Sequence, residues 1–209
     1  MKNKELRALH ITTNHSGKMK GMASLSTCCK SNPYCQQHCK VKGSICEKCY
    51  AQTMMKHYTS MDKCLERNAE ILTKEVLPIE ELPLLNYCYF RFEAFGDLIN
   101  ETQLINYFNI CRKNPDTNFA LWTKNPHIVK KVVKTKKKPK NLQIILSSLF
   151  INHQIDISNM PYIDKVFTVY DQKTIDEEGI EINCGARNCL KCHQCYKANG
   201  AKVINEKLK

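Results

Sequence analysis

The spacing of apolar residues in the first half of the chain predicts a helix followed by a strand. Apolar side chains recur at steps of three and four through 54–72, which indicates a helix with one buried face. The stretch 86–93 is rich in aromatic residues and alternates in polarity, which is typical of a strand. Gly96 and Asp97 follow and predict the turn that ends this strand.

The second half of the chain continues the alternation. Asn100 caps a predicted helix that has Gln103 three residues later. Asn118–Thr123 reads as a strand, and Pro126 begins the next helix. Two further strands are expected at 142–148 and 164–171. Strands and helices alternating at this spacing predict an α/β fold with a mainly parallel sheet, whose ligands bind at the carboxyl ends of the strands.

The N-terminal and C-terminal parts of the chain are rich in cysteine. The segment 8–14 is expected to be the first strand, so a cysteine-rich loop lies between it and the first helix. That placement puts the loop at the functional edge of the sheet. We expect a core at 1–183 and a cysteine-rich metal-binding segment at 184–209.

Composition bears on how the cysteines are interpreted. With 209 residues, 43% of them hydrophobic, the chain is long enough to bury a core. It has no apolar run of the roughly 20 residues that a membrane span needs, and its first residues lack the apolar segment of a secretory signal. We therefore expect a cytoplasmic protein, in which clustered cysteines favour metal binding or catalysis over disulfides.

Positive charge is concentrated in one segment. The formal net charge is +12, and residues 129–140 hold seven lysines and no acid. Such a run is commonly a solvated face, but it also attracts phosphate backbones. Nucleic acid is therefore a candidate partner, through Lys130 to Lys140.

The cysteine loop offers a cluster site. Cys46 and Cys49 form a C-x2-C pair, a spacing at which two thiolates bind one metal centre. A third ligand comes from upstream, where Cys35 and Cys39 are alternatives. Three cysteines with a fourth position open would suit a cluster whose last iron binds a substrate. Cys28 and Cys29 lie farther off and are reserve candidates.

The tail contains a second cysteine group. Its members follow at spacings x4, x2 and x2: Cys184, Cys189, Cys192 and Cys195. Successive cysteines at x2 spacing are typical of ferredoxin-type iron–sulfur ligation, whereas structural zinc usually takes two separated pairs. The tail therefore favours an iron–sulfur cluster, with zinc as the alternative. Whether loop and tail cysteines share one centre is left open by the sequence.

Several motifs together resemble a known family. CEKCYA before a long helix, then YFRFEAFGDL, then NYFNICRKNPDTNFALWTKNP and a terminal cysteine knuckle resemble the phage-associated "gene product eighty-eight" family of uncharacterised proteins. The likeness covers most of the chain in order. A looser likeness connects CKVKGSICEKCYA with the radical S-adenosylmethionine (SAM) enzymes, whose cluster loop follows the first strand.

These resemblances imply a fold, cofactors and site residues. The fold would be a partial (β/α) barrel of about five or six strands. A 4Fe–4S cluster on the loop would donate an electron to SAM, an auxiliary cluster would occupy the tail, and an external donor would supply electrons. The residues assigned to SAM or substrate by position are Arg91, Glu93, Asp97, Lys124 and Ser147. The alternative is a purely structural role, in which Arg91 and Glu93 form an ion pair and Asp97 stabilises its turn.

Two function classes follow. The first is an iron–sulfur enzyme of the radical-SAM-like type, with nucleic acid as a candidate substrate. The second is a non-catalytic zinc or iron–sulfur protein that binds nucleic acid or a protein partner, in which the metal holds loops in place. Cleavage of SAM discriminates between them.

Overall fold

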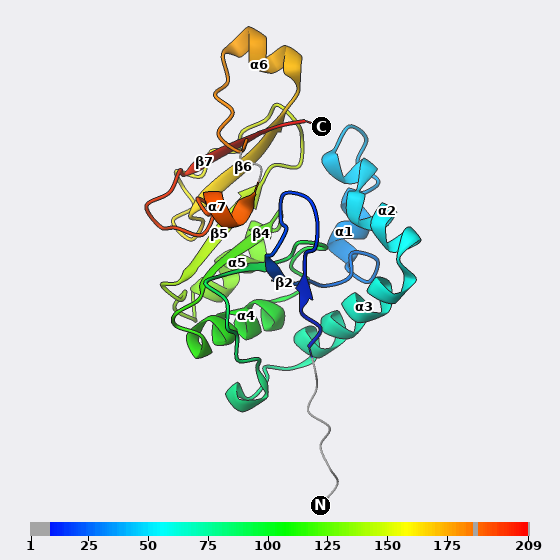
Figure 1. Cartoon of the computed structure of the whole chain (residues 1–209), viewed down its shortest axis with the longest axis vertical. Coiled ribbons are helices and arrows are strands. Elements are labelled where there is room, and N and C mark those ends of the chain that lie inside the picture. The colour runs from blue at the N-terminus through cyan, green and yellow to red at the C-terminus, as the bar shows by residue number, and fades with distance from the viewer. Residues whose placement is uncertain (1–8, 186–187, 209) are drawn as a thin grey trace, which may run out of the picture.

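The centre of the fold is a seven-stranded sheet (Figure 1). The computed structural model describes residues 9–185 and 188–208. The strands lie in chain order, with β1 antiparallel to β2 and every later neighbouring pair parallel. Their bounds are β1 Thr12–Thr13, β2 Ala23–Leu25, β3 Tyr89–Phe92, β4 Asn118–Thr123, β5 Leu142–Ser147, β6 Lys165–Tyr170 and β7 Val203–Lys207.

Seven α-helices and two short 3-10 helices lie within the described residues. The α-helices are α1 Pro33–His38, α2 Tyr50–His57, α3 Thr59–Lys74, α4 Glu101–Lys113, α5 Pro126–Val133, α6 Gln172–Glu178 and α7 Cys189–Cys192. The 3-10 helices are η1 Ile45–Lys48 and η2 Ile79–Glu81. No described helix is both long and apolar enough to cross a membrane.

The main core lies between the sheet and the helices α3, α4 and α5. Phe90 and Phe92 of β3 point into it and are fully buried, and the ring of Phe92 stacks on that of Tyr107 with centroids 4.2 Å apart. The alternate residues Tyr89 and Arg91 are only partly buried. They lie on the opposite face of the sheet, because successive side chains of a strand point to opposite sides.

The expected alternation of strands and helices is confirmed in the second half of the chain. Asn100 caps α4, and its side chain accepts a hydrogen bond from the backbone N–H of Gln103 at 3.0 Å. The strand at Asn118–Thr123 and the helix that begins at Pro126 are as expected. The strands expected at 142–148 and 164–171 correspond to β5 and β6.

The first strand expected at 8–14 is present only as a short antiparallel edge strand. Only Thr12–Thr13 pair there, as the antiparallel edge strand β1. The chain then turns back through Gly17 and Gly21, which have φ of +68° and +83°, and the parallel part of the sheet begins with β2. β2 is three residues long and buried throughout, so its sequence lacks the alternation that identifies a half-exposed strand.

The single helix expected across 54–72 is two helices. α2 and α3 are separated at Tyr58, where φ is −123° and ψ is 81°. Apolar residues on both sides of the break keep the same spacing, so their pattern does not mark it.

The tail adds the last strand. β7 pairs in parallel with β6, so residues beyond Cys184 complete the same sheet. The division into 1–183 and 184–209 stays a prediction. Among the described strands no pair joins β7 to β1 or β2, so the sheet is open, and the partial barrel also stays a prediction.

Candidate functional site

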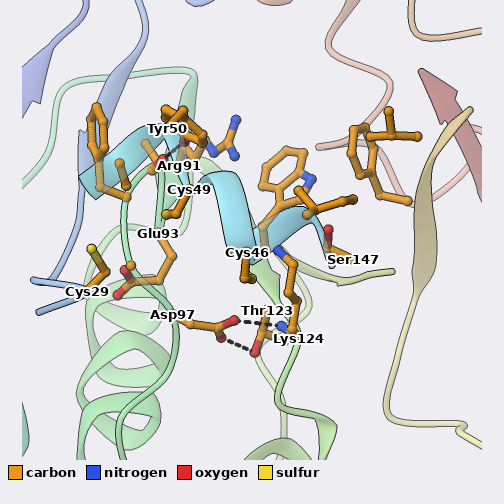
Figure 2. A pocket seen from close by; sticks show the side chains of 18 of the residues that line it. Cys29, Cys46, Cys49, Tyr50, Arg91, Glu93, Asp97, Thr123, Lys124 and Ser147 are labelled. Carbon is orange, nitrogen blue, oxygen red and sulfur yellow. Dashed lines mark hydrogen bonds between the residues drawn. The ribbon is translucent and has the colours of Figure 1, made fainter. Parts of the chain in front are cut away.

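A cavity of about 500 Å³ lies where β3, β4 and β5 end (Figure 2). Its size is within the range of small-molecule sites. Every site residue nominated from the sequence lines it: Arg91, Glu93, Asp97, Lys124, Ser147, Cys35, Cys39, Cys46, Cys49, Cys184, Cys189, Cys192 and Cys195. The folded chain therefore brings the loop cysteines and the tail cysteines to one cavity.

The cysteine loop is fixed to the sheet edge by buried polar side chains. Asn32 is fully buried, and its amide donates to the backbone carbonyl of Asp97 at 2.9 Å. Its side-chain oxygen accepts from the N–H of Tyr34 at 2.9 Å and so caps α1. The hydroxyl of Tyr34 donates to the carbonyl of Lys124 at 2.5 Å. These contacts join the loop to the ends of β3 and β4.

The turn after β3 packs closely against the backbone of Thr27. Gly96 has φ of +80°, and a Cβ there would lie 2.5 Å from the carbonyl oxygen of Thr27. Only glycine tolerates both conditions. Tyr50, at the start of α2, donates its hydroxyl hydrogen to the carbonyl of Ala94 in the same turn. The turn therefore holds both ends of the cysteine loop.

Three loop thiols form a group on one side of the cavity. Cys46 and Cys49 are both electrostatic neighbours of Cys35. Burial raises the pKa of Cys35 and of Cys46. A hydrogen bond from Cys29 and backbone N–H groups at the start of α2 together lower the pKa of Cys49, against the effect of burial. Cys49 is thus poised as a thiolate, the form that binds metal.

Cys29 is a site residue that sequence reasoning set aside. Its side chain is almost fully buried, it lines the cavity, and Cys35 and Cys49 are its neighbours. The hydrogen bond to Cys49 and burial raise its pKa. Its spacing from the C-x2-C pair gave no sign of this contact. The detectable signal was its place shortly after the end of a strand, at Leu25, but β2 was not predicted.

The other loop cysteines differ in their surroundings. Cys39 lines the cavity, but its Sγ donates to the backbone carbonyl of Gln36 at 3.2 Å. Cys28 is fully buried and does not line the cavity. Its Sγ contacts the carboxylate of Asp62 at 3.5 Å.

The four tail cysteines form a second group. Cys195 has the other three, Cys184, Cys189 and Cys192, as electrostatic neighbours, and burial raises its pKa to about 12. Lys18 connects this group to the loop between β1 and β2. Its ammonium donates to the Sγ of Cys184 at 3.1 Å, and its carbonyl accepts from the N–H of Cys189 at 2.8 Å.

The spacing of the thiols bears on the kind of metal. Among the described residues, three or more Cys, His, Asp or Glu ligand atoms lie within 4.8 Å of one another only at Cys28, Asp62 and Glu66. Four sulfurs around one zinc ion, each about 2.3 Å from it, would lie closer together than this limit. Neither cavity group has such a spacing.

Two of the acidic residues that line the cavity, Glu93 and Asp97, are occupied by the protein itself. The carboxylate of Glu93 accepts from the amide of Gln103 at 2.7 Å, from Tyr107, and from the N–H and hydroxyl of Thr27. Burial raises the pKa of Glu93 to about 8. Its φ is +54°, an unusual backbone conformation for a residue other than glycine. This network favours a structural role for Glu93.

Asp97 joins the ends of β3 and β4 (Figure 2). Its carboxylate accepts from the hydroxyl of Thr123 at 2.5 Å, from the N–H of Leu98 at 2.7 Å and from the N–H of Lys124 at 2.8 Å. Burial raises its pKa despite these donors. The alternative in which Asp97 stabilises its turn fits this geometry.

The basic residues of the cavity are differently placed. The proposed structural ion pair between Arg91 and Glu93 is not among the ion pairs of the described residues. Arg91 instead lies over the ring of Trp122, 4.0 Å from the centroid. Trp122 packs against a small core cluster on this face of the sheet and also lines the cavity. Ser147, at the end of β5, is buried and lines the cavity as well.

The lysine-rich segment lies away from the cavity. None of the residues Lys130 to Lys140 lines it. The segment connects the end of α5 to the first residue of β5, and strand starts lie at the sheet edge opposite the cavity. Lys131 pairs with Glu101 at 2.9 Å and Lys138 with Asp164 at 2.9 Å. The other lysine side chains of the segment are exposed. The backbone carbonyl of Lys137 accepts a hydrogen bond from Arg112.

Comparison with known proteins gives a family. The profile of the family described as Gene product 88 matches residues 2–207. No curated protein and no solved structure matches the chain. The family match spans nearly the whole sequence, including both cysteine groups and the strands that carry the cavity residues. The chain therefore belongs to the Gene product 88 family.

Proposed function

We propose that this chain is an iron–sulfur enzyme of the radical-SAM-like type, with one cluster on each side of the cavity. The observation that carries the proposal is the meeting of two cysteine groups at the carboxyl-terminal edge of a parallel sheet. Ligands of open α/β sheets bind at this edge. A substrate in the cavity would lie within reach of both groups.

The donor set supports iron–sulfur clusters over zinc. Each group supplies at least three thiols and no histidine with an assigned role, and neither group has three ligand atoms within 4.8 Å of one another. Thiolates are the usual ligands of iron–sulfur clusters. Zinc in the tail is the alternative, and it would require these cysteines to move closer together.

The loop residues have distinct tasks under this proposal. Cys46, Cys49 and Cys35 would hold three irons of a 4Fe–4S cluster, leaving the fourth iron for SAM. We favour Cys35 over Cys39 because Cys35 neighbours both members of the C-x2-C pair. The Cys39 thiol instead donates a hydrogen bond to a backbone carbonyl. A reduced cluster supplies single electrons, and the reaction needs an external electron donor.

The tail group would hold an auxiliary cluster. Four thiols, Cys184, Cys189, Cys192 and Cys195, suffice to ligate every iron of a 4Fe–4S cluster. Lys18 adds a hydrogen bond to the Sγ of Cys184. Hydrogen bonds to the sulfurs raise a cluster's reduction potential, so this centre would accept electrons more readily than a bare one.

A second function is favoured by the exposed lysines. Nucleic acid would bind along Lys130 to Lys140 by counterion release, with the metal centres only holding the loops. This non-catalytic protein would need no SAM in the cavity. None of these lysines lines the cavity, so this binding surface is separate from the candidate catalytic site.

SAM cleavage separates the two functions. Anaerobically prepared, dithionite-reduced protein should convert SAM to 5′-deoxyadenosine, and Cys49→Ala should abolish this conversion. Cys88→Ala is the matched control, because Cys88 is exposed and does not line the cavity. No 5′-deoxyadenosine from an iron-loaded protein, with salt-sensitive binding to DNA or RNA, would instead establish the non-catalytic function.

A further inference from the structure

The guanidinium of Arg91 is partly buried and has few hydrogen-bond acceptors within the protein. Its Nε is buried without a hydrogen-bond partner, and Nη1 donates only to the Sδ of Met19, at 3.3 Å. Among the described residues it has no carboxylate partner. Burying a cation whose donors are unused is unfavourable unless another group pairs with it. Arg91 therefore has an N–H donor for which the described residues provide no acceptor.

A second cation points to the same space. Lys124 is fixed at its backbone by Asp97, at 2.8 Å, and its side chain extends into the cavity (Figure 2). Like Arg91, it forms no ion pair within the described part of the chain. Lys18, by contrast, pairs with Glu206 at 2.9 Å. Arg91 and Lys124 are thus two cavity cations that form no ion pair among the described residues, although Asp97 is an electrostatic neighbour of Lys124.

The three acidic residues that line the cavity already have partners within the protein, Glu206 through its ion pair with Lys18. The carboxylates of Glu93 and Asp97 already accept from Thr27, Gln103, Tyr107, Thr123 and the backbone. The groups facing Arg91 are the thiols of Cys189 and Cys195 and the phenols of Tyr50 and Tyr196. The thiols provide a competing explanation, in which Arg91 only compensates the charge of a tail cluster.

We propose that Arg91 and Lys124 form an oxyanion subsite, so that the molecule bound in the cavity carries a carboxylate or a phosphate. A guanidinium binds such planar or tetrahedral oxyanions through paired N–H groups, and Arg91 lines the cavity while it stacks on Trp122. The inference rests on the proposed function insofar as this anion belongs to the substrate or to SAM. The subsite itself requires no metal.

Binding of two probes tests the subsite. Equilibrium dialysis of anaerobically purified protein against inorganic pyrophosphate and against SAM should give saturable binding. Arg91→Gln and Lys124→Gln should each weaken binding of at least one probe by tenfold or more. Arg112→Gln is the matched control, because Arg112 also lies over an aromatic ring, that of Phe108, but is exposed. Trp122, the single tryptophan, provides an independent fluorescence signal.

The outcomes identify the source of the anion. Weakened binding of pyrophosphate alone assigns the subsite to a substrate phosphate, and weakened binding of SAM alone assigns it to the SAM carboxylate. Equal affinities in Arg91→Gln, Arg112→Gln and the native protein would overturn the proposal, as would absence of binding by either probe. Arg91→Lys guards against misfolding, because it should restore part of the lost affinity.

Iron and sulfide measured on the same samples keep the two proposals apart. Protein without iron that still binds a probe through Arg91 would contradict the proposed function and support the subsite. Fully iron-loaded protein whose probe binding does not depend on Arg91 or Lys124 would overturn the subsite alone.

Discussion

Replacing Asn32 by alanine should weaken both the fold and the loop metal site. Asn32 is fully buried and makes two kinds of contact: it caps α1 through the N–H of Tyr34, and it donates to the carbonyl of Asp97 at 2.9 Å. Loss of an N-cap costs about 1 kcal/mol. A buried carbonyl left without its donor costs roughly 1–3 kcal/mol. The free energy of unfolding should therefore fall by roughly 2–4 kcal/mol.

The size of this loss sets the assay. For a chain of this length each kcal/mol lowers Tm by about 2–4 °C, so metal-free Asn32→Ala should melt roughly 5–15 °C lower. Cys35 lies three residues after Asn32, and its backbone N–H donates to the side-chain oxygen of Asn32 at 3.4 Å. The variant, prepared anaerobically well below its Tm, should therefore retain less iron at the loop site.

Asn106→Ala is the control that separates stability from site geometry. Asn106 is also fully buried, accepts from the N–H of Leu77 at 2.9 Å and donates to the carbonyls of Leu72 and Glu75 at 2.9 Å. It lies on α4, outside the cavity. A similar drop in Tm with unchanged iron is expected for this variant. Equal iron content in the two variants would refute the role given to Asn32 in placing the cysteine loop.

Three further predictions concern single side chains. Cys35→Ser should lose the loop iron while Cys39→Ser keeps it, as measured by iron content; the reverse result would exchange their roles. Cys29→Ala should retain the loop cluster but lower its reduction potential by roughly 40–60 mV, the equivalent of about 1 kcal/mol for a lost hydrogen bond to Cys49. Loss of the cluster in that variant, seen in its absorption, would make Cys29 a ligand. Burial raises the pKa of Glu93 from 4.5 to about 8, so the folded chain binds this proton more tightly than the unfolded chain. Its contribution to the free energy of unfolding should fall as pH rises from about 4.5 to 8. Urea titrations should show a flatter pH dependence of this free energy for Glu93→Gln than for the native protein. The same pH dependence in both proteins would contradict the raised pKa.

Local sequence signals were sufficient for much of the fold. Asn100 and Pro126 marked helix starts, and the aromatic alternation marked β3, because each signal depends on neighbouring residues alone. β2 and β7 were missed for another reason. β2 is three buried residues, and β7 acquires its strand character by pairing with β6 across a long separation.

The candidate site was partly accessible to sequence reasoning. Cysteine spacing nominated residues that do line the cavity, because short spacings keep thiols close in any fold. The contact between Cys29 and Cys49 depends on where β2 ends, and the stacking of Arg91 on Trp122 depends on the register of β3 against β4. Neither follows from spacing, since both join segments far apart in the chain.

The most direct test of the central proposal is the iron and acid-labile sulfide content of anaerobically prepared protein, measured with its absorption spectrum. Two 4Fe–4S clusters predict about eight iron and eight sulfide per chain and a brown protein with broad absorbance near about 400 nm. Cys46→Ala should reduce the iron by about half if the loop and tail centres are independent. A colourless protein that contains zinc and no sulfide would contradict the proposal.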